Sequence, residues 1–437
     1  MKPLARTLKM VLALTLVSNL AIGCSSNAGD APAVEGQGAK KENVTLRVML
    51  AKEASGDKFF DWMSENMKIY TELNPQVTFD VTANASGDQY MTVLTTEMAA
   101  NNVPDIVQTW ASERMRPFAE SGRLLDLKET LESDAEWKQF LMEDPLKATT
   151  FDGGIYGIPA TLDSEIVYYN KEVFDKYQLE EPQTYDEFVK VVTTLKDNGI
   201  TPMTVANKSS WIGTIPFMMI AERIGGLEMY QNVVIDKTEP WTSEPLIEAG
   251  KVLQELVALG TFEKDVNSVL SSESEAKLIE GKAGMFATGT WMLPKFSEKM
   301  GDNLGYFNFP DIEGGKGSKD HFIMNPNVTL SVAKDSKHKE EAIDFMKFVF
   351  SQERQAELAK QGFFTATKVE VNKEEISAVA AELHEELAKS TGSMYPWDNP
   401  LGAYMGAELN NTTQTLYIGK DPMKAFTNLQ KKQDNKK

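Results

Sequence analysis

The chain has 437 residues and a formal net charge of −19 at pH 7. So large an acidic excess argues against a nucleic-acid partner, because proteins that bind nucleic acids usually carry a basic surface. It does not exclude an anionic ligand, since the charge around a binding site can differ from the net charge. The single cysteine, Cys24, excludes an internal disulfide. Roughly 390 residues remain after the N-terminal region. A single hydrophobic core usually supports fewer residues than this, so we expect two lobes.

The first 23 residues have the layout of a signal peptide. Three basic residues precede an apolar run over residues 10–22, and this run is shorter than a bilayer span of about 20 residues. Cys24 follows at once, and a lone thiol at this position resembles the lipidated cysteine of a bacterial lipoprotein. The resemblance is imperfect, since Ala21 stands where the lipobox usually has leucine. An ordinary signal peptide with a chance cysteine is the alternative.

Residues 24–43 form a stretch dominated by small and polar side chains. Such a stretch cannot bury enough apolar surface to fold, so we expect a flexible tether. Cleavage before Cys24 removes three basic residues and no acid, which changes the net charge from −19 to −22. No later segment of the sequence is long and apolar enough to cross a membrane.

The folded part opens with patterns that alternate between strand and helix. Apolar residues recur at every second position in the expected strands and at helical spacing in the expected helices. One helix stops before Pro75, because proline disfavours helical geometry in the preceding residue, and Ser86 with Gln89 forms a possible capping box for the next helix. This order predicts α/β layering with a largely parallel sheet. The expected strands are 44–50, 77–81 and 104–107, and the expected helices are 59–73 and 90–98.

Later helices are marked by their ends. Thr184 and Glu187 form a capping box for a helix that closes at residues 198–199. Another helical region follows Asp335, and a last helix begins at Pro422. The stripes of methionine and phenylalanine on these helices indicate core packing, not a cofactor site.

The order of short motifs resembles that of the family 1 extracellular solute-binding proteins, the group that includes maltose-binding protein. Each motif is weak alone, but together their order and spacing cover nearly the whole chain. The motifs are YTELNP (70–75), VPDIV (103–107), YGIP (156–159), YYNK (168–171), PQTYDEF (182–188), GKAGM (281–285), GTW (289–291) and EAIDF (341–345) with Gln355.

This resemblance implies an α/β, two-lobed, periplasmic-binding-protein-like fold. The lobes are discontinuous and joined by hinge crossings, the ligand lies in the cleft between them, and binding closes the lobes by a hinge motion. By analogy the crossings lie near residues 160–165, 322–325 and 362–367. Lobe 1 then comprises 44–163 and 325–365, and lobe 2 comprises 164–324 and 366–437.

The resemblance also implies a function. The chain is expected to capture a sugar or oligosaccharide and to deliver it to the permease subunits of an ABC importer. It would act as a monomer, anchored through Cys24 to the outer face of the cell membrane, without catalysis, cofactor or metal. A receptor that presents its ligand to a sensor kinase is an alternative that the sequence leaves open.

A sugar cleft needs aromatic faces beside carboxylates and amides, because sugars offer C–H patches for stacking and hydroxyls for hydrogen bonding. Trp110 follows a strand, where open α/β sheets place their ligands. Trp397 stands among prolines and polar residues in a stretch typical of a loop, which favours a functional role. Trp211 and Trp291 could equally well belong to the core. The polar and aromatic candidates beside these tryptophans are Glu113, Tyr395 and Asp398.

Acidic and amide residues near the crossings complete the candidate site. Asp163 lies on the first expected crossing, Glu53 follows the first strand, and Asn325 lies at the second crossing. A solvated or capping acid is the alternative for the two carboxylates. The remaining tryptophans, which we expect to be structural, are Trp62, Trp137 and Trp241.

Two other classes of function remain as alternatives. A glycoside hydrolase also needs paired acids near aromatics, but the sequence has no serine-elbow, Walker, HExxH or CxxC motif. Its three histidines lie in polar stretches that we expect to be exposed. The same fold could instead bind a peptide, a polyamine, a metal ion or a phosphate ester, and the number of aromatics expected at the cleft favours a sugar over these.

Overall fold

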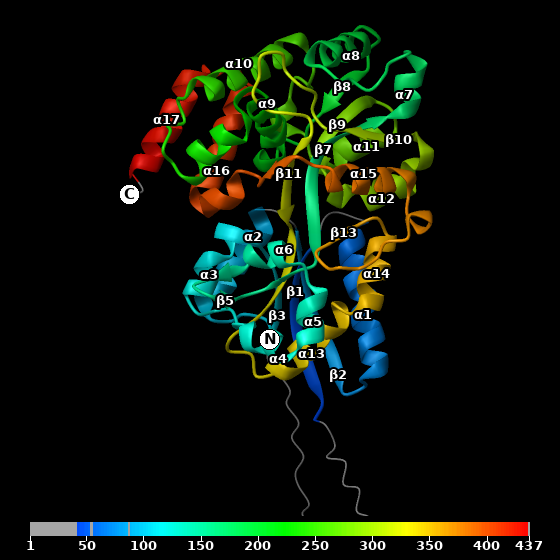
Figure 1. Cartoon of the computed structure of the whole chain (residues 1–437), viewed down its shortest axis with the longest axis vertical. Coiled ribbons are helices and arrows are strands. Elements are labelled where there is room, and N and C mark those ends of the chain that lie inside the picture. Colours follow the sequence, from blue (N-terminus) through cyan, green and yellow to red (C-terminus); the bar gives the residue numbers. More distant parts are fainter. Residues whose placement is uncertain (1–41, 53–55, 86–87, 436–437) are drawn as a thin grey trace, which may run out of the picture. The chain divides into compact units, whose positions relative to one another are not determined.

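The computed structural model describes residues 42–52, 56–85 and 88–435. The predicted signal peptide, Cys24 and most of the predicted tether lie outside the described residues, as do Glu53 and Ser86. None of the helices in the described ranges combines the length and the apolarity needed to span a bilayer. The described chain forms two large β-sheets with helices packed on them (Figure 1).

From here on, lobe 1 is our name for a five-stranded sheet and the helices grouped with it. In spatial order its strands are β2 (Val77–Ala85), β1 (Val44–Lys52), β3 (Ile106–Trp110), β12 (Val328–Val332) and β6 (Ile158–Pro159). Its helices are α1 (Lys58–Leu73), α2 (Asp88–Ala100), η1 (Ser112–Arg114), α3 (Arg116–Glu120), α4 (Lys128–Ser133), α5 (Ala135–Phe140), α6 (Glu143–Lys147), α13 (Lys339–Val349) and α14 (Gln352–Lys360), and a hairpin joins β4 (Thr150–Phe151) to β5 (Gly154–Ile155).

Lobe 2 is our name for a seven-stranded sheet and the helices grouped with it. The main path is β14 (Gly392–Met394), β11 (His321–Pro326), β7 (Thr161–Asn170), β9 (Ala283–Gly289) and β8 (Thr201–Thr204), and β10 (Leu304–Phe307) and β13 (Phe364–Thr365) also pair with β7. Its helices are α7 (Lys171–Lys176), α8 (Tyr185–Asp197), α9 (Ser210–Tyr230), η2 (Gln231–Ile235), α10 (Glu244–Leu259), η3 (Val266–Ser268), α11 (Ser271–Ile279), η4 (Thr290–Met292), α12 (Leu293–Met300), η5 (Gly301–Asn303), η6 (Lys373–Glu375), α15 (Ala378–Ala388), α16 (Asp398–Leu416) and α17 (Pro422–Asn435).

The sheet of lobe 1 carries apolar side chains on both faces. Val48 and Leu50 of β1 pack in one cluster with residues of α1 and α13, whereas Met49 and Ala51 pack in another with residues of α2. Helices therefore cover both sheet faces, as layered α/β domains require. The core of lobe 2 is a separate cluster in which Trp241 is fully buried.

The chain passes between the two sheets at Ala160, between β6 and β7, and at Asn327, between β11 and β12. A third passage follows α14. Backbone hydrogen bonds join the passages side by side. Ala160 N donates to Val328 O at 2.7 Å, and Asn327 N donates to Thr161 O at 3.0 Å. Ala366 N, on the third passage, donates to Ala160 O at 3.2 Å.

The strand directions differ from the sequence-based expectation. Both sheets are mixed, not largely parallel, because β12 returns directly from lobe 2 and pairs antiparallel with β3, and β7 is antiparallel to both β9 and β11. A direct return of this kind needs no crossover helix, unlike a parallel connection. The expected lobe boundaries, after residue 163 and before residue 325, fall just inside β7 and β11.

Local signals at helix ends were predicted well. Helix α1 ends at Leu73, with Asn74 as its C-cap, before the proline. Thr184 and Glu187 form both bonds of the capping box at the start of α8. Trp62 and Trp137 are buried, with 4% and 7% of their surface exposed, so their structural assignment is confirmed.

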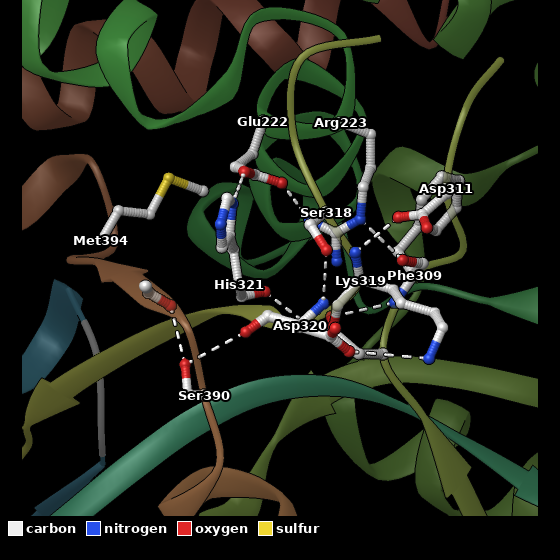
Figure 2. Close-up of polar contacts among 12 residues, drawn as sticks. Glu222, Arg223, Phe309, Asp311, Ser318, Lys319, Asp320, His321, Ser390 and Met394 are labelled. Carbon is white, nitrogen blue, oxygen red and sulfur yellow. Dashed lines mark hydrogen bonds and ion pairs between the residues drawn. The ribbon is translucent and has the colours of Figure 1, made fainter. Parts of the chain in front are cut away.

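A buried ionic cluster lies in lobe 2, where α9 meets the start of β11 (Figure 2). We define it as Glu222, Arg223 and His321. Glu222 and Arg223 are 1% and 2% exposed and form an ion pair. Glu222 Oε1 also contacts His321 Nδ1 at 2.6 Å, and Arg223 Nε donates to Phe309 O at 2.8 Å. His321 is therefore partly buried, as are the other two histidines, and the expectation that all three are exposed was wrong.

Candidate functional site

A cleft lined by residues of both lobes encloses about 1380 Å³, open solvent included. Lobe 1 contributes the ends of β1 and β3 and the start of α1, and lobe 2 contributes α9, α11, α12 and α16. Strands β7 and β11 line it near the passages between the sheets. The cleft thus lies at carboxyl ends of strands β1 and β3 of the sheet, as in other open α/β folds.

Most of the candidates from the sequence lie at this cleft. Glu113, Tyr395 and Trp397 are not among the lining residues, and Glu53 lies outside the described residues. The candidates that line the cleft are Trp110, Asp163, Trp211, Trp291, Asn325 and Asp398.

Trp110 is the last residue of β3 and is partly exposed. Its ring packs edge-on against buried Tyr90, with 5.3 Å between centroids and 81° between planes. The Arg114 guanidinium lies 5.9 Å from the Trp110 ring centroid. These contacts fix the orientation of an indole that also lines the cleft.

Trp211 and Trp291 form an aromatic pair on the lobe 2 side of the cleft. Their ring centroids are 5.6 Å apart. The Trp291 ring covers Gly289, where an added Cβ would lie 1.8 Å from Trp291 Cζ3. Only glycine leaves room for this ring position. Gly289 is paired in register with Glu165 of β7, so the Trp291 ring lies over the strand next to that carboxylate.

Asp163 and Glu165 lie on the same face of β7, because side chains alternate along a strand. Asn325 of β11 is paired in register with Asp163. Asp163 is 3% exposed and accepts hydrogen bonds from Thr161 Oγ1 at 3.1 Å and from Thr290 Oγ1 at 2.9 Å. Burial raises the pKa of Asp163 above its ordinary value, and these bonds, with one from Asn327, act in the opposite direction.

Glu165 is a cleft residue that the sequence reasoning did not select. It is 3% exposed, and its Oε2 atom is buried without a hydrogen-bond partner. Burial raises the pKa of Glu165 well above its ordinary value, and the negative charges of Asp398 and Asp163 act in the same direction. Its spacing of two residues from Asp163 on one strand was the signal that could have identified it.

An ion pair joins the lobes at the edge of the cleft. Arg114 of η1 donates to Asp398 of α16 at 2.6 Å, and Asn410 Nδ2 also donates to Asp398 at 3.4 Å. Glu113, next to Arg114, accepts two bonds of 2.8 Å from Arg116 Nε. Its carboxylate is therefore engaged within lobe 1, which explains its absence from the cleft lining.

Trp397 lies in the core of lobe 2, with no exposed surface. Its ring is surrounded by Phe217, Tyr230 and Trp241, at centroid distances of 5.8, 6.1 and 6.2 Å. Tyr395 is tied to the same region through its backbone N–H, which donates to the Tyr230 hydroxyl at 3.2 Å. The apolar surface of a tryptophan favours burial over exposure in a loop. In this conformation the neighbouring Asp398, not Trp397, faces the cleft.

The arrangement can stack planar apolar faces and exchange hydrogen bonds with a polar ligand. Among the described residues no group of three or more histidine, cysteine or acidic side chains is placed to hold a metal ion.

The sequence and the fold are similar to those of known solute-binding proteins. Residues 51–356 match the family described as bacterial extracellular solute-binding protein. The multiple sugar-binding protein of Streptococcus mutans is 23% identical over 65% of this chain and 66% of its own length. The diacetylchitobiose binding protein DasA of Streptomyces coelicolor is 25% identical over 83% of this chain and 84% of its own. A structure from work on xylan utilisation by the bacterium Caldanaerobius polysaccharolyticus is 26% identical, with a TM-score of 0.83, and the match covers 89% of this chain and 100% of that one.

Proposed function

Because the chain belongs to the family of bacterial extracellular solute-binding proteins, we propose that it is the receptor of an ABC importer and captures a sugar or oligosaccharide in its cleft. Proteins of this family bind solutes and are not catalysts. The names of the relatives, which include a multiple sugar-binding protein and a diacetylchitobiose binding protein, support a carbohydrate ligand.

The observation that carries this proposal is the combination of indole faces and carboxylates at one cleft. Trp110 lies on the lobe 1 side, and the Trp211–Trp291 pair lies on the lobe 2 side. Asp163 and Glu165 of β7 line the same cleft. A sugar ring can stack its C–H patches on the indoles while its hydroxyls reach the carboxylates.

Capture by closure is supported by the passages between the sheets. The three passages are short and hydrogen-bonded side by side at Ala160. Ion pairs between Arg114 and Asp398 and between Lys58 and Glu298 join the lobes away from these passages. Opening at the hinge would break such pairs, and ligand contacts with both lobes would favour their re-formation.

The protein acts outside the cytoplasm, as its family does. We propose that Cys24 carries a lipid that anchors it to the outer face of the membrane, and that residues 24–43 act as the tether. We propose further that the protein works as a monomer and delivers its ligand to the permease subunits of the importer.

Thermal unfolding of the purified protein against mono- and oligosaccharides, with amino acids, peptides and polyamines as controls, tests the ligand class. A ligand that binds only the native state stabilises it by about 2.7 kcal/mol at a hundredfold excess over Kd. We expect selected sugars to raise Tm and Trp110→Ala to abolish the shift. Ile418→Ala, at a site that is 72% exposed and outside the cleft lining, is the matched control.

Either of two results would contradict the proposal. A flat response to all sugars with a shift from a peptide or polyamine would keep the fold and change the ligand class. Release of shorter sugars from an oligosaccharide during incubation would indicate a glycoside hydrolase instead.

A further inference from the structure

The described residues that line the cleft include three cationic side chains, and each has an acidic partner. Arg114 is paired with Asp398, and Lys295 is paired with Glu275 at 2.6 Å. The third, Lys58, is paired with a glutamate of α12. None of these cations is paired with either carboxylate of β7.

The two carboxylates of β7 differ in how they are satisfied. Asp163 accepts hydrogen bonds from hydroxyl groups on two sides. Glu165 has no ion pair among the described residues, and its buried Oε2 accepts no hydrogen bond. A buried carboxylate oxygen without a partner costs free energy. Since Glu165 lines the cleft, a ligand is the available source of a donor.

An aromatic face lies beside this carboxylate. The Trp291 ring covers Gly289, which is paired in register with Glu165, and Trp211 packs against Trp291. An indole face attracts cations, and a carboxylate forms its strongest hydrogen bonds with charged donors. The two features together suit a protonated amine better than a hydroxyl, and a hydroxyl better than an anion.

We propose that Glu165 determines the chemical class of the ligand: it selects a glycan unit that donates hydrogen bonds, binds a unit with a free amino group most tightly, and excludes a unit that carries a carboxylate. This inference rests on the proposed function, because it assumes that the cleft binds sugars. An acidic sugar unit at Glu165 would add a negative charge beside Asp163 and Asp398, and the cations that line the described part of the cleft are already in ion pairs. A protonated amine instead stabilises the ionised form of Glu165 and opposes the burial and negative charges that raise its pKa.

The test compares sugars that differ only in charge. Two matched series of oligosaccharides, one glucose-based and one galactose-based, each include a neutral, a free-amine and a uronate form, and Kd is measured by calorimetry at a pH where the amine is protonated. Because a charged hydrogen bond contributes more than a neutral one, we expect the amine form to bind about tenfold to a hundredfold more tightly than the uronate form, with the neutral form between them.

Substitutions at Glu165 separate a role in specificity from a structural role. Glu165→Gln should remove the preference for the amine over the uronate and should also raise the Tm of the ligand-free protein, because it removes an unsatisfied buried acid. A structural carboxylate would show a lower Tm on substitution. Glu165→Asp keeps a carboxyl group and should keep the order of the three forms at weaker affinity.

Glu222→Gln is the matched control, since Glu222 is equally buried but bonded inside lobe 2. It should lower Tm and leave the ratio of amine to uronate affinity unchanged. If sugars bind but the uronate form binds as tightly as the amine form, this inference is wrong and the proposed function stands. If no member of either series binds and a non-sugar solute does, the proposed function fails and this inference fails with it.

Discussion

The ionic cluster and the cleft both contain buried acids, and the two regions satisfy the oxygens of these acids in different ways. In the ionic cluster both oxygens of Glu222 are engaged, one by Arg223 and the other by His321 (Figure 2). At the cleft, Asp163 accepts bonds from neutral hydroxyls, and Glu165 keeps one oxygen without a partner.

This difference separates structural from functional charge. A buried acid that is compensated within the chain holds elements together, here α9, β11 and the segment at Phe309. A buried acid that is left uncompensated at a cleft destabilises the empty protein and can be satisfied by a ligand. Substitutions in the two regions should therefore change stability with opposite signs.

The largest effect is expected in the ionic cluster. Arg223→Met leaves Glu222 buried without its main counter-charge and should lower the free energy of unfolding by about 3–5 kcal/mol. Urea unfolding of the ligand-free protein measures it. The double variant with Glu222→Gln contains no buried charge pair and should recover most of the loss, and equal or greater destabilisation of the double variant would contradict the role assigned to the pair.

Two tryptophans allow the same comparison of a structural side chain with a functional one, now for apolar side chains. Trp397→Ala creates a cavity in the lobe 2 core and should lower the free energy of unfolding by about 3 kcal/mol, with ligand affinity nearly unchanged. Trp291→Ala should weaken ligand binding about tenfold through loss of a stacking face, at a smaller cost in stability. Calorimetric measurement of Kd and urea unfolding of both variants test this prediction. A large loss of ligand affinity in Trp397→Ala would show that Trp397 contributes to ligand binding after all.

The sequence was most informative where structure depends on neighbours along the chain. The ends of α1 and α8 follow from Pro75 and from the Thr184–Glu187 capping box, which are local interactions. The position of Trp110 at a strand end follows from the strand pattern for the same reason. The antiparallel return of β12 was not predicted, because it depends on pairing with β3, far away in sequence.

The site was less predictable because burial depends on distant partners. Trp397 stands in a stretch with the composition of a loop, but α9 and the segment at Trp241 supply the rings that bury it. Glu165 has no tryptophan near it in sequence. Its spacing from Asp163 was a sequence signal, but its position beside an aromatic face depends on the strand pairing that places Gly289, and with it Trp291, next to it.

The smallest expected effect is a pH dependence that distinguishes Glu165 from the ionic cluster. The pKa of Glu165 is raised well above its ordinary value of 4.5, by burial and by facing Asp398 and Asp163. From about pH 4.5 up to the native pKa, the folded state therefore binds more protons than the unfolded chain, so the free energy of unfolding falls as pH rises. The effect is smaller than that of Arg223→Met because the native state can take up a proton instead of burying the charge.

Urea unfolding of the ligand-free wild type and of Glu165→Gln between about pH 4 and pH 8 measures this effect. The two proteins should be nearly equally sensitive to pH below about pH 4.5, where the acid is protonated in both states, and the wild type should lose stability relative to the variant above it. Asp163, whose pKa is also raised, is present in both proteins, so the comparison isolates Glu165 together with its electrostatic coupling to Asp163. A saturating ligand that donates a hydrogen bond to Glu165 lowers its pKa and should reduce the difference, whereas a difference that is unchanged by ligand would mean that Glu165 does not contact it.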